Sequence, residues 1–472
     1  MKYLKNKIQF LFLLSILGMV AGNAHAQPNT MYFMKNVSQT WEMNPANTGI
    51  ESGWHFSMPG FSSMDLTMNT NGWKYSDLIH MGTGQYADSL IVDLDKFYNR
   101  LDDSNFMYEK INYSLFTLGF RTGKHVFNLG ITEKEFANPF FGKNMVALIK
   151  NGNAPYLGTS FNTGSFGLNG IHYREIALGY AYDLNKKLTL GMTAKVLFGL
   201  AAAQSKDINM LVQAPGDASY LNVEGSGQLN VSGPFQFYTS PDGLIDSISS
   251  NIDAGSYLTN TGNMGFAVDM GAVFKPNDKV TLSASIIDLG SIGWKIDVTN
   301  LTLNGQFSYE GVNIDNSLNK NDPNYKSPSD AFKDLGDSIK HAFSIDNTNN
   351  TFSTAIPVKV YIGGSYQVNP NIEVGGLARA RIYNSQASLS FTASGNAYWG
   401  DFFSLSASYS IIEGSYTNLG LGFGLRGGPV QFYIVTDNVL TAFDPANASS
   451  LNLRFGLNFL IGRNKEKNRG PI

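Results

Sequence analysis

The chain of 472 residues has no cysteine, and only 15% of its residues are charged. Without cysteine, a disulfide framework, a thiolate metal site and a lipidated N-terminal cysteine are all excluded. A typical soluble domain carries about 25% charged residues. Beyond the first 26 residues, no apolar run approaches the ~20 residues of a membrane helix. These absences argue against both a soluble domain of ordinary composition and a helical membrane protein.

The first 26 residues have the pattern of an export signal. Lys2, Lys5 and Lys7 precede the apolar run Ile8 to Ala21, and the small-residue motif "AHA" at 24–26 follows. We therefore expect cleavage before Gln27 and export to the envelope of a Gram-negative bacterium. The alternative is an N-terminal membrane anchor, for which the run is short.

Charge balance excludes one class of partner. Without the signal, 31 basic residues remain against 37 acidic ones. Because a nucleic-acid partner requires a basic surface, no nucleic-acid partner is expected.

What the chain does contain is glycine (49 residues) and aromatic residues (13%). Apolar surface that is not helical is typical of a transmembrane β-barrel, in which apolar residues occupy every second position. The segment "FFSLSASYSI", 402–411, shows this alternation: Leu405 and Tyr409 share one face, and serines fill the other. The same pattern predicts that Leu190, Phe423 and Leu457 face lipid.

The alternating runs are 10 to 12 residues long, which suits a tilted membrane-crossing strand better than a soluble one. The fold class predicted is all-β: a closed antiparallel transmembrane β-barrel of about 14 strands, with a soluble sandwich as the alternative. Short and long connections alternate, as periplasmic turns and outer loops do. The expected strands are 52–70 (bent at Pro59-Gly60), 112–122, 124–134, 173–184, 187–200, 263–275, 279–289, 357–368, 371–382, 386–398, 402–412, 416–426, 430–437 and 451–461.

Several segments leave the strand count open at 12, 14 or 16. Residues 219–231 and 301–308 also have strand patterns, and we assign them to hairpins within the outer loops. Helices are expected at Asp93 to Leu101, at Ser327 to Phe343 and at Phe140 to Gly152. All three lie in outer loops, where they would cap the barrel mouth or form a lid.

Four motifs together resemble one family of barrels. They are "NPANTG" at 44–49, "REIALGYAYDLNKKLTLGMTAKVLFGL" at 174–200, "DLGSIGWK" at 288–295, and "VQFYIVTDNVL" followed by "LNLRFGLNFLIGR" at the end of the chain. The chain resembles the FadL-like outer-membrane barrels and, within them, an uncharacterised Bacteroidota family with a domain of unknown function.

The resemblance implies an N-terminal hatch inside the lumen. Residues 27–51 would form this hatch, residues 52–461 the barrel, and residues 462–472 a polar periplasmic tail. A stiff turn at Asn44, Pro45 and Ala46 would let the hatch enter the lumen and return to the wall. The alternative is an ordinary periplasmic tail.

The inward face of the predicted strands carries separated charges. These lumen candidates are Glu175, Lys195, Asp269, Lys359, Tyr361, Glu373, Arg379, Arg381, Arg426 and Arg454. One interpretation is an ion-pair network that joins the hatch to the wall. The other is a polar path that guides an anionic head group, with Leu197, Tyr361 and Leu377 in contact with an acyl chain.

Signals for catalysis are poor, so no enzyme activity, cofactor or metal is expected. The five histidines after the signal lack metal-ligand spacing, and no G-x-S-x-G motif is present. The FadL resemblance implies passage of hydrophobic or amphipathic small molecules across the outer membrane. Two alternatives remain: an envelope scaffold or secretion-associated barrel with protein partners at the outer loops, and an outer-membrane lipid enzyme.

The expected partners are outer-membrane lipid, a hydrophobic small-molecule ligand and, during biogenesis, the barrel assembly machinery. Many barrels end on an aromatic residue that this machinery reads. Here the basic, polar tail follows the last strand, so Phe459 within that strand is the expected substitute.

Overall fold

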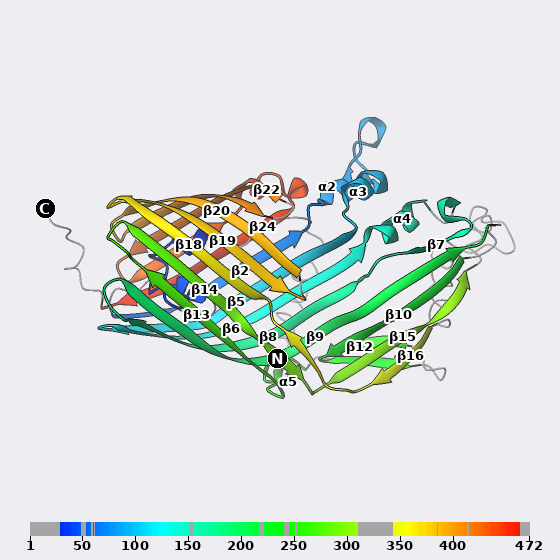
Figure 1. The fold of residues 1–472 in the computed structure, drawn as a ribbon, viewed down its shortest axis with the longest axis horizontal. Helices are drawn as coiled ribbons and strands as arrows, with labels where there is room; N and C mark the ends of the chain where they lie inside the picture. The colour runs from blue at the N-terminus through cyan, green and yellow to red at the C-terminus, as the bar shows by residue number, and fades with distance from the viewer. Residues whose placement is uncertain are drawn as a thin grey trace.

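The computed structural model describes residues 29–48, 53–57, 60, 62–151, 154–216, 221–239, 245–250, 253–309, 343–384, 386–412 and 415–462. These residues form a closed antiparallel barrel of 14 wall strands. The barrel occupies the left part of Figure 1, and a sheet extends from it to the right. Among the described residues, no helix is both long and apolar enough to cross a membrane.

The wall follows chain order almost throughout, because short turns join neighbouring antiparallel strands. The last strand pairs with the first and closes the sheet. In order around the barrel, the wall strands are β1 (Gly53–Ser57) with β2 (Ser63–Thr70), β5 (Ser104–Thr122), β6 (His125–Gly142), β8 (Gly167–Asp183), β9 (Leu188–Ala214), β13 (Asn263–Phe274), β14 (Val280–Trp294), β18 (Val358–Asn369) with β17 (Phe352–Ala355), β19 (Ile372–Tyr383), β20 (Gln386–Trp399), β21 (Phe403–Ile412), β22 (Ser415–Gly427), β23 (Val430–Thr436) and β24 (Ser450–Ile461).

The first wall strand is broken, as the sequence predicted. β1 and β2 both lie between β5 and β24. On β5, Ser57 pairs with Thr117 and Ser63 pairs with Ser114, so five residues of one strand oppose two of the other. The break therefore leaves a local irregularity in an otherwise continuous ladder.

The predicted number of 14 strands is confirmed, but several strands are longer than predicted. β5 begins at Ser104, β6 ends at Gly142 and β9 ends at Ala214. Their additional residues continue beyond the part in which the apolar alternation is regular. Outside the bilayer no alternation of lipid and lumen is imposed on a strand, so the sequence pattern underestimated its length.

The strand extensions support a second sheet beyond the barrel, which we call the wing. β9 pairs with β13 through residues 188–199 and with β10 (Leu221–Ser232) through residues 202–213. β10 pairs with β15 (Val298–Tyr309), and β15 with β16 (Phe343–Thr348). β7 (Thr159–Asn162) joins the far end of β9. The predicted strands 219–231 and 301–308 thus pair with each other rather than forming separate hairpins.

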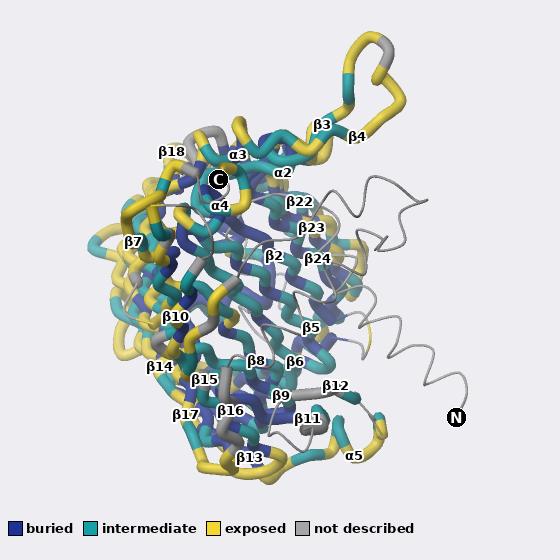
Figure 2. The backbone as a smooth tube through the Cα atoms, turned by 90° about the vertical axis from the view of Figure 1, so that its right-hand side faces the viewer, coloured by how far each residue is buried: buried dark blue, intermediate teal, exposed yellow. Residues whose placement is uncertain are grey.

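Several short helices and a short hairpin lie at the loop end of the barrel. Of the predicted helices, 93–101 and 140–152 are confirmed as α3 (Leu94–Arg100) and α4 (Lys143–Asn151), while most of 327–343 lies outside the described residues. A hairpin projects from this end (Figure 2). The remaining elements are η1 (Thr30–Phe33), η2 (Ser38–Glu42), α2 (Tyr75–Leu78), β3 (Ile79–Met81), η3 (Gly84–Tyr86), β4 (Leu90–Val92), η4 (Ala154–Tyr156), β11 (Phe235–Thr239), β12 (Ile245–Ser250), α5 (Ala254–Leu258), η5 (Val439–Ala442) and η6 (Pro445–Asn447).

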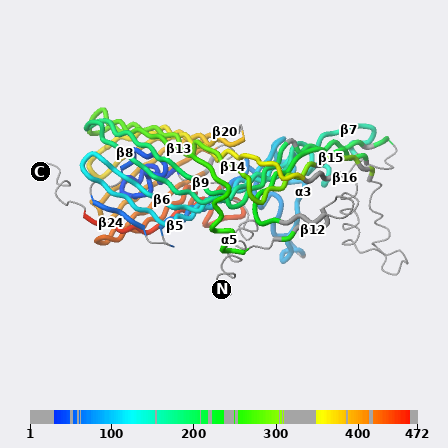
Figure 3. Tube along the Cα trace, turned by 90° about the horizontal axis from the view of Figure 1, so that it is seen from below, coloured from blue at the N-terminus to red at the C-terminus, as the bar shows by residue number. Residues whose placement is uncertain are grey.

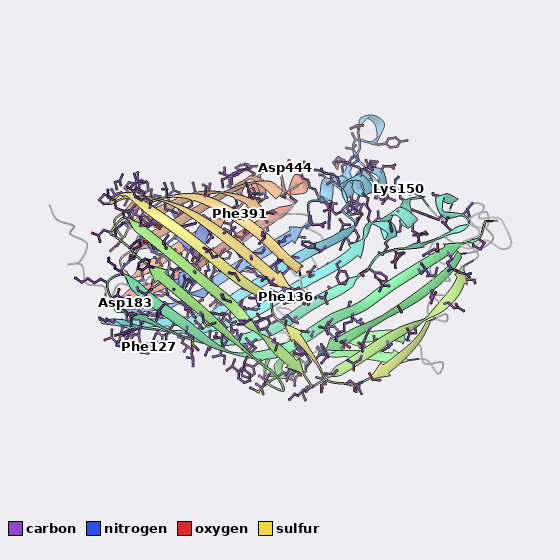
Figure 4. All side chains as sticks on the ribbon, in the orientation of Figure 1. Phe127, Phe136, Lys150, Asp183, Phe391 and Asp444 are labelled. Carbon is purple, nitrogen blue, oxygen red and sulfur yellow. The ribbon has the colours of Figure 1, made fainter. Side chains whose placement is uncertain are left out.

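Side chains of the wall alternate between an apolar outer face and a polar inner one. Leu190 and Leu405 are 46% and 40% exposed, whereas Ser406 is 1% exposed. Phe391, labelled in Figure 4, is 59% exposed and belongs to the same outer face. A closed sheet with an apolar exterior satisfies its backbone hydrogen bonds within itself, which is what a bilayer requires.

Candidate functional site: a filled lumen

Residues 29–48 lie inside the barrel, and we call them the hatch (dark blue in Figure 3). They form η1 and η2 and pair with no described strand. Side chains of the wall satisfy their backbone instead. The Asp437 carboxylate accepts hydrogen bonds from the backbone N–H of Asn29 (3.0 Å) and of Thr30 (2.7 Å). Tyr398 donates to the carbonyl of Phe33 at 2.8 Å.

Further side-chain contacts fix the hatch at other points of the wall. The hydroxyls of Thr30 and Ser408 lie 2.6 Å apart. The amides of Gln39 and Asn458 exchange two hydrogen bonds, of 2.5 and 2.9 Å. Such contacts satisfy buried polar groups without covalent or sheet-like attachment.

The Asn44-Pro45-Ala46 turn sits against two wall glycines. A Cβ on Gly271 would lie 2.1 Å from Asn44 Oδ1, and one on Gly191 would lie 2.3 Å from the carbonyl carbon of Pro45. Asn44 Oδ1 accepts from the backbone N–H of Ala46 at 2.9 Å, which stabilises the turn locally. Only glycine leaves room for the turn at these two wall positions.

Apolar hatch residues pack against the inner face of the wall. Tyr32 stacks on Tyr361, with ring centroids 5.5 Å apart, and Phe33 covers Gly375. Met31 and Met34 are fully buried in the same cluster. This packing removes apolar hatch surface from water and stabilises the closed arrangement.

A network of buried charges lies next along the lumen. Lys195 Nζ is 2.7 Å from Asp269 and 2.5 Å from Asp288. Lys134 Nζ is 2.6 Å from Glu175. Lys359 also bonds to Asp288. Residues of six wall strands therefore neutralise one another here, as buried charges must.

Two more ion-pair groups join the hatch to the wall directly. Glu42 of the hatch accepts from Arg454 at 2.5 Å, and Lys35 lies 2.7 Å from Glu373. On the wall beside them, Lys110 Nζ lies 2.6 Å from the carboxylate of Asp65, and that carboxylate also lies 4.0 Å from Arg454. The hatch is thus part of the charge balance of the lumen.

Above the charges, toward the loop end, aromatic side chains fill the lumen. Along β8, Ala177, Glu175 and Tyr173 follow one another on the inner face, so Tyr173 lies beyond the charge network. Phe136 packs edge-on against Tyr383 and Trp294 is fully buried. The lumen therefore contains, in series, an apolar layer with the hatch, a charged layer and an aromatic layer.

The space that remains between these layers is small. A cavity of about 50 Å³ is lined by hatch residues Trp41 and Glu42 and by the charged network. A cavity of this size holds only a few water molecules. A solute larger than this cavity cannot occupy it unless the hatch moves.

The structure brings most of the predicted lumen residues together. Glu175, Lys195, Asp269 and Lys359 share one network, while Glu373 and Arg454 contact the hatch. The guanidinium groups of Arg379 and Arg381 lie over the rings of Tyr361 (5.3 Å) and Tyr108 (3.8 Å).

Arg426 is the exception. Its Nε donates to the carbonyl of Gly428 at 3.1 Å, near the turn after β22. It lies at the short-turn end rather than in the charged layer. A proposed path through Arg379, Arg381 and Arg426 is therefore not a compact site.

Sequence reasoning missed four participants, Asp65, Lys110, Lys134 and Asp288. Lys110 lies in the unpredicted extension of β5, and Lys134 at the end of a predicted strand. Asp288 has a positive φ of 62° beside a register shift between β13 and β14, so the alternation fails there. The alternation of inward and outward residues, followed to the last residue of the predicted strand 124–134, could have found Lys134; it could not have found Asp288.

No cluster of potential ligands among the described residues could hold a metal ion. The closed wall, its apolar exterior and its filled polar lumen define an outer-membrane-type β-barrel. The chain belongs to a family of unknown function, DUF5723, whose profile matches residues 45–437. No curated protein matched the chain.

The chain is similar in fold to several solved structures, among them the following three. A deltaS2S3 mutant of the TodX monoaromatic hydrocarbon channel has 10% identity and a TM-score of 0.39, covering 88% of this chain and 91% of its own. The toluene transporter TodX of Pseudomonas putida has 9% identity and a TM-score of 0.35, covering 92% and 93%. A FadL homologue of Pseudomonas aeruginosa has 10% identity and a TM-score of 0.33, covering 88% and 89%.

Proposed function

We propose that the protein is a gated conduit for hydrophobic or amphipathic small molecules across the outer membrane. The observation that carries this proposal is that a separate segment, the hatch, lies inside the lumen, and that the cavity between it and the charged network measures only about 50 Å³. A barrel that served only as a scaffold would not need a separate segment inside its lumen. Displacement of the hatch is the event that would open the path.

The attachment of the hatch favours such a displacement. All 14 wall strands pair with wall strands, so the ladder stays complete when residues 29–48 leave. The hatch is held by side-chain hydrogen bonds, two ion pairs and apolar packing, and a single hydrogen bond has only a modest net free energy. On moving, the hatch residues would form hydrogen bonds to water, while the hydrogen bonds between wall strands would remain.

The layers of the lumen suit a ligand with both apolar and polar parts. The aromatic layer faces the loop end, where a ligand from outside would arrive. The charged layer follows and would accept a polar or anionic group. Exit is through the lumen at the short-turn end or through the irregular wall beside Ser57 and Ser62, where hydroxyls hydrogen bond at 2.5 Å.

A disulfide that ties the hatch to the wall tests the proposal. The Thr30 and Ser408 hydroxyls are 2.6 Å apart, so T30C/S408C places two thiols within bonding reach in a chain that has no other cysteine. We expect uptake of a small aromatic or acyl solute into proteoliposomes to stop after oxidation and to return after reduction.

The matched control crosslinks the wall alone. The hydroxyls of Thr392 and Ser410, on β20 and β21, are 2.8 Å apart, and T392C/S410C leaves the hatch free. Oxidation of this control should not change uptake. Equal uptake by the oxidised and reduced T30C/S408C protein, with the disulfide formed, would show that the hatch does not gate passage.

The wing favours a second candidate function, an envelope scaffold or secretion-associated barrel. Its strands β10, β15 and β16 stand beyond the barrel and are not needed for closure of the wall. A protein partner would be expected to dock there. Stable co-purification of a partner that is lost when the wing is replaced by a short turn would support this function, provided that uptake is absent.

A further inference from the structure

Basic side chains gather on one arc of the short-turn rim. Three consecutive turns of the barrel, β5–β6, β8–β9 and β13–β14, carry five exposed lysines and one acidic residue, Asp278. We call these lysines the basic crescent: Lys124, Lys186, Lys187, Lys275 and Lys279. Within the described part of the chain, none of them forms an ion pair or a side-chain hydrogen bond.

The three turns adjoin one another. Lys124 accepts a backbone hydrogen bond from Asp183 at 3.0 Å, and Lys187 accepts one from Lys275 at 2.7 Å. The five lysines therefore belong to one continuous surface. The other described turns at this end, 370–371, 400–402 and 428–429, carry only Asp401 as a charged residue beyond the strand ends.

Side-chain hydrogen bonds hold two of these turns in place. Asn185 Oδ1 accepts from the backbone N–H of Lys187 at 2.8 Å, and Asn277 Oδ1 accepts from that of Lys279 at 2.9 Å. Such Asx turns restrict the backbone. The lysines thus start from fixed positions, which lowers the entropic cost of binding a ligand between them.

The lipid-facing belt begins directly beside the crescent. Tyr180, Leu190 and Phe274 are 41%, 46% and 42% exposed on the outer face of the same strands. Figure 4 shows Phe127, on the outer face of β6, near Asp183 at this end of the barrel. A molecule bound here can place its apolar part on the belt and its head group at the lysines.

We propose that the basic crescent binds the phosphate head groups of anionic phospholipid in the leaflet around the short-turn end. Lysine stems lie along apolar surface while the ammonium groups reach the interface. Clustered lysines beside a bilayer attract anionic lipid, by about 1 kcal/mol for each one near the surface. An acidic periplasmic protein would meet the charges but would leave the adjoining apolar belt unused, so lipid fits the surface better.

The test compares retention of two defined lipids by the purified full-length barrel. K187Q/K275Q neutralises the centre of the crescent and leaves the Asx turns intact. We expect native mass spectrometry to show roughly thirtyfold less bound phosphatidylglycerol than for the unmodified protein, with phosphatidylcholine unchanged. Raised salt should weaken phosphatidylglycerol binding to the unmodified protein.

The control variant K206Q/K295Q removes two exposed lysines near the loop end. It should retain phosphatidylglycerol as the unmodified protein does, and both variants should show the heat-dependent gel mobility of a folded barrel. Equal phosphatidylglycerol retention by K187Q/K275Q would overturn the proposal. Loss of an acidic co-purifying protein with no loss of lipid would likewise overturn it and assign the crescent to a protein partner.

Discussion

At the residue scale, the free-energy cost of burying charge explains how the charged side chains of the lumen are arranged. Lys195 is 5% exposed and has Asp269, Asp288 and Glu175 around it. The sequence revealed that Lys195, Asp269 and Glu175 face inward, because they lie on regular strands. It did not reveal that they meet, since that depends on the register between β8, β9 and β13.

Lys195→Met is expected to destabilise the barrel. The substitution leaves carboxylates without their shared counter-charge in a buried layer, and breaking a buried ion pair in this way costs about 3–5 kcal/mol. Urea unfolding of the protein in liposomes measures the change. Lys206→Met, at an exposed wing position, is the control and should change the free energy of unfolding by less than about 0.5 kcal/mol. An unchanged midpoint for Lys195→Met would show that the layer tolerates the imbalance.

Gly271→Val should loosen the hatch turn. A side chain there enters the space of Asn44, whose Oδ1 would lie 2.1 Å from the new Cβ. Overpacking of about 1–3 kcal/mol would raise the population in which the hatch is displaced by roughly 5- to 150-fold. In an Ala46→Cys background, labelling by a hydrophilic maleimide should accelerate accordingly.

Gly376→Val is the matched control, because nothing lies within 4 Å of a Cβ at that wall position. Its labelling rate should equal that of Ala46→Cys alone. If Gly271→Val also leaves the rate unchanged, the turn is not seated against β13 as described.

At the element scale, the regular strands were predictable and the irregular ones were not. The alternation over β21 and β22 predicted the ends of both strands to within a residue or two, because one face of each strand meets lipid and the other meets the lumen. Two wing strands, β10 and β15, correspond to the predicted strands 219–231 and 301–308, but their pairing into one sheet could not be predicted, because it depends on the fork of β9 after residue 199. The hatch has no periodic pattern, so its place inside the barrel rested on resemblance until its contacts were seen.

Deletion of residues 29–46 should give a folded but leaky barrel. No wall strand pairs with these residues, so the closed sheet remains. Liposome swelling in a small sugar should be faster for the deletion variant than for the complete protein, while heat-dependent gel mobility should persist. A deletion variant that fails to fold would show that the hatch is needed for assembly of the wall, contrary to the proposed independence of the two.

At the scale of the whole molecule, the alternation of side chains ties every element to the membrane. The outer face carries the lipid-facing belt, the inner face carries the charges and hydroxyls that hold the hatch, and the short-turn rim carries the basic crescent. The 14-strand wall encloses enough space for the hatch to fit inside, and this enclosure is what makes gating physically reasonable.

The most direct test of this account is a spin-label scan of β21 in a bilayer. A nitroxide placed singly at residues 403 to 411 in the cysteine-free chain reports its accessibility to oxygen, which concentrates in hydrocarbon, and to a water-soluble nickel complex. The account predicts a period of two, with oxygen accessibility high at Leu405, Ala407 and Tyr409 and low at Ser406 and Ser408. Uniform accessibility along the strand, or high oxygen accessibility at the serines, would contradict a closed barrel embedded in lipid.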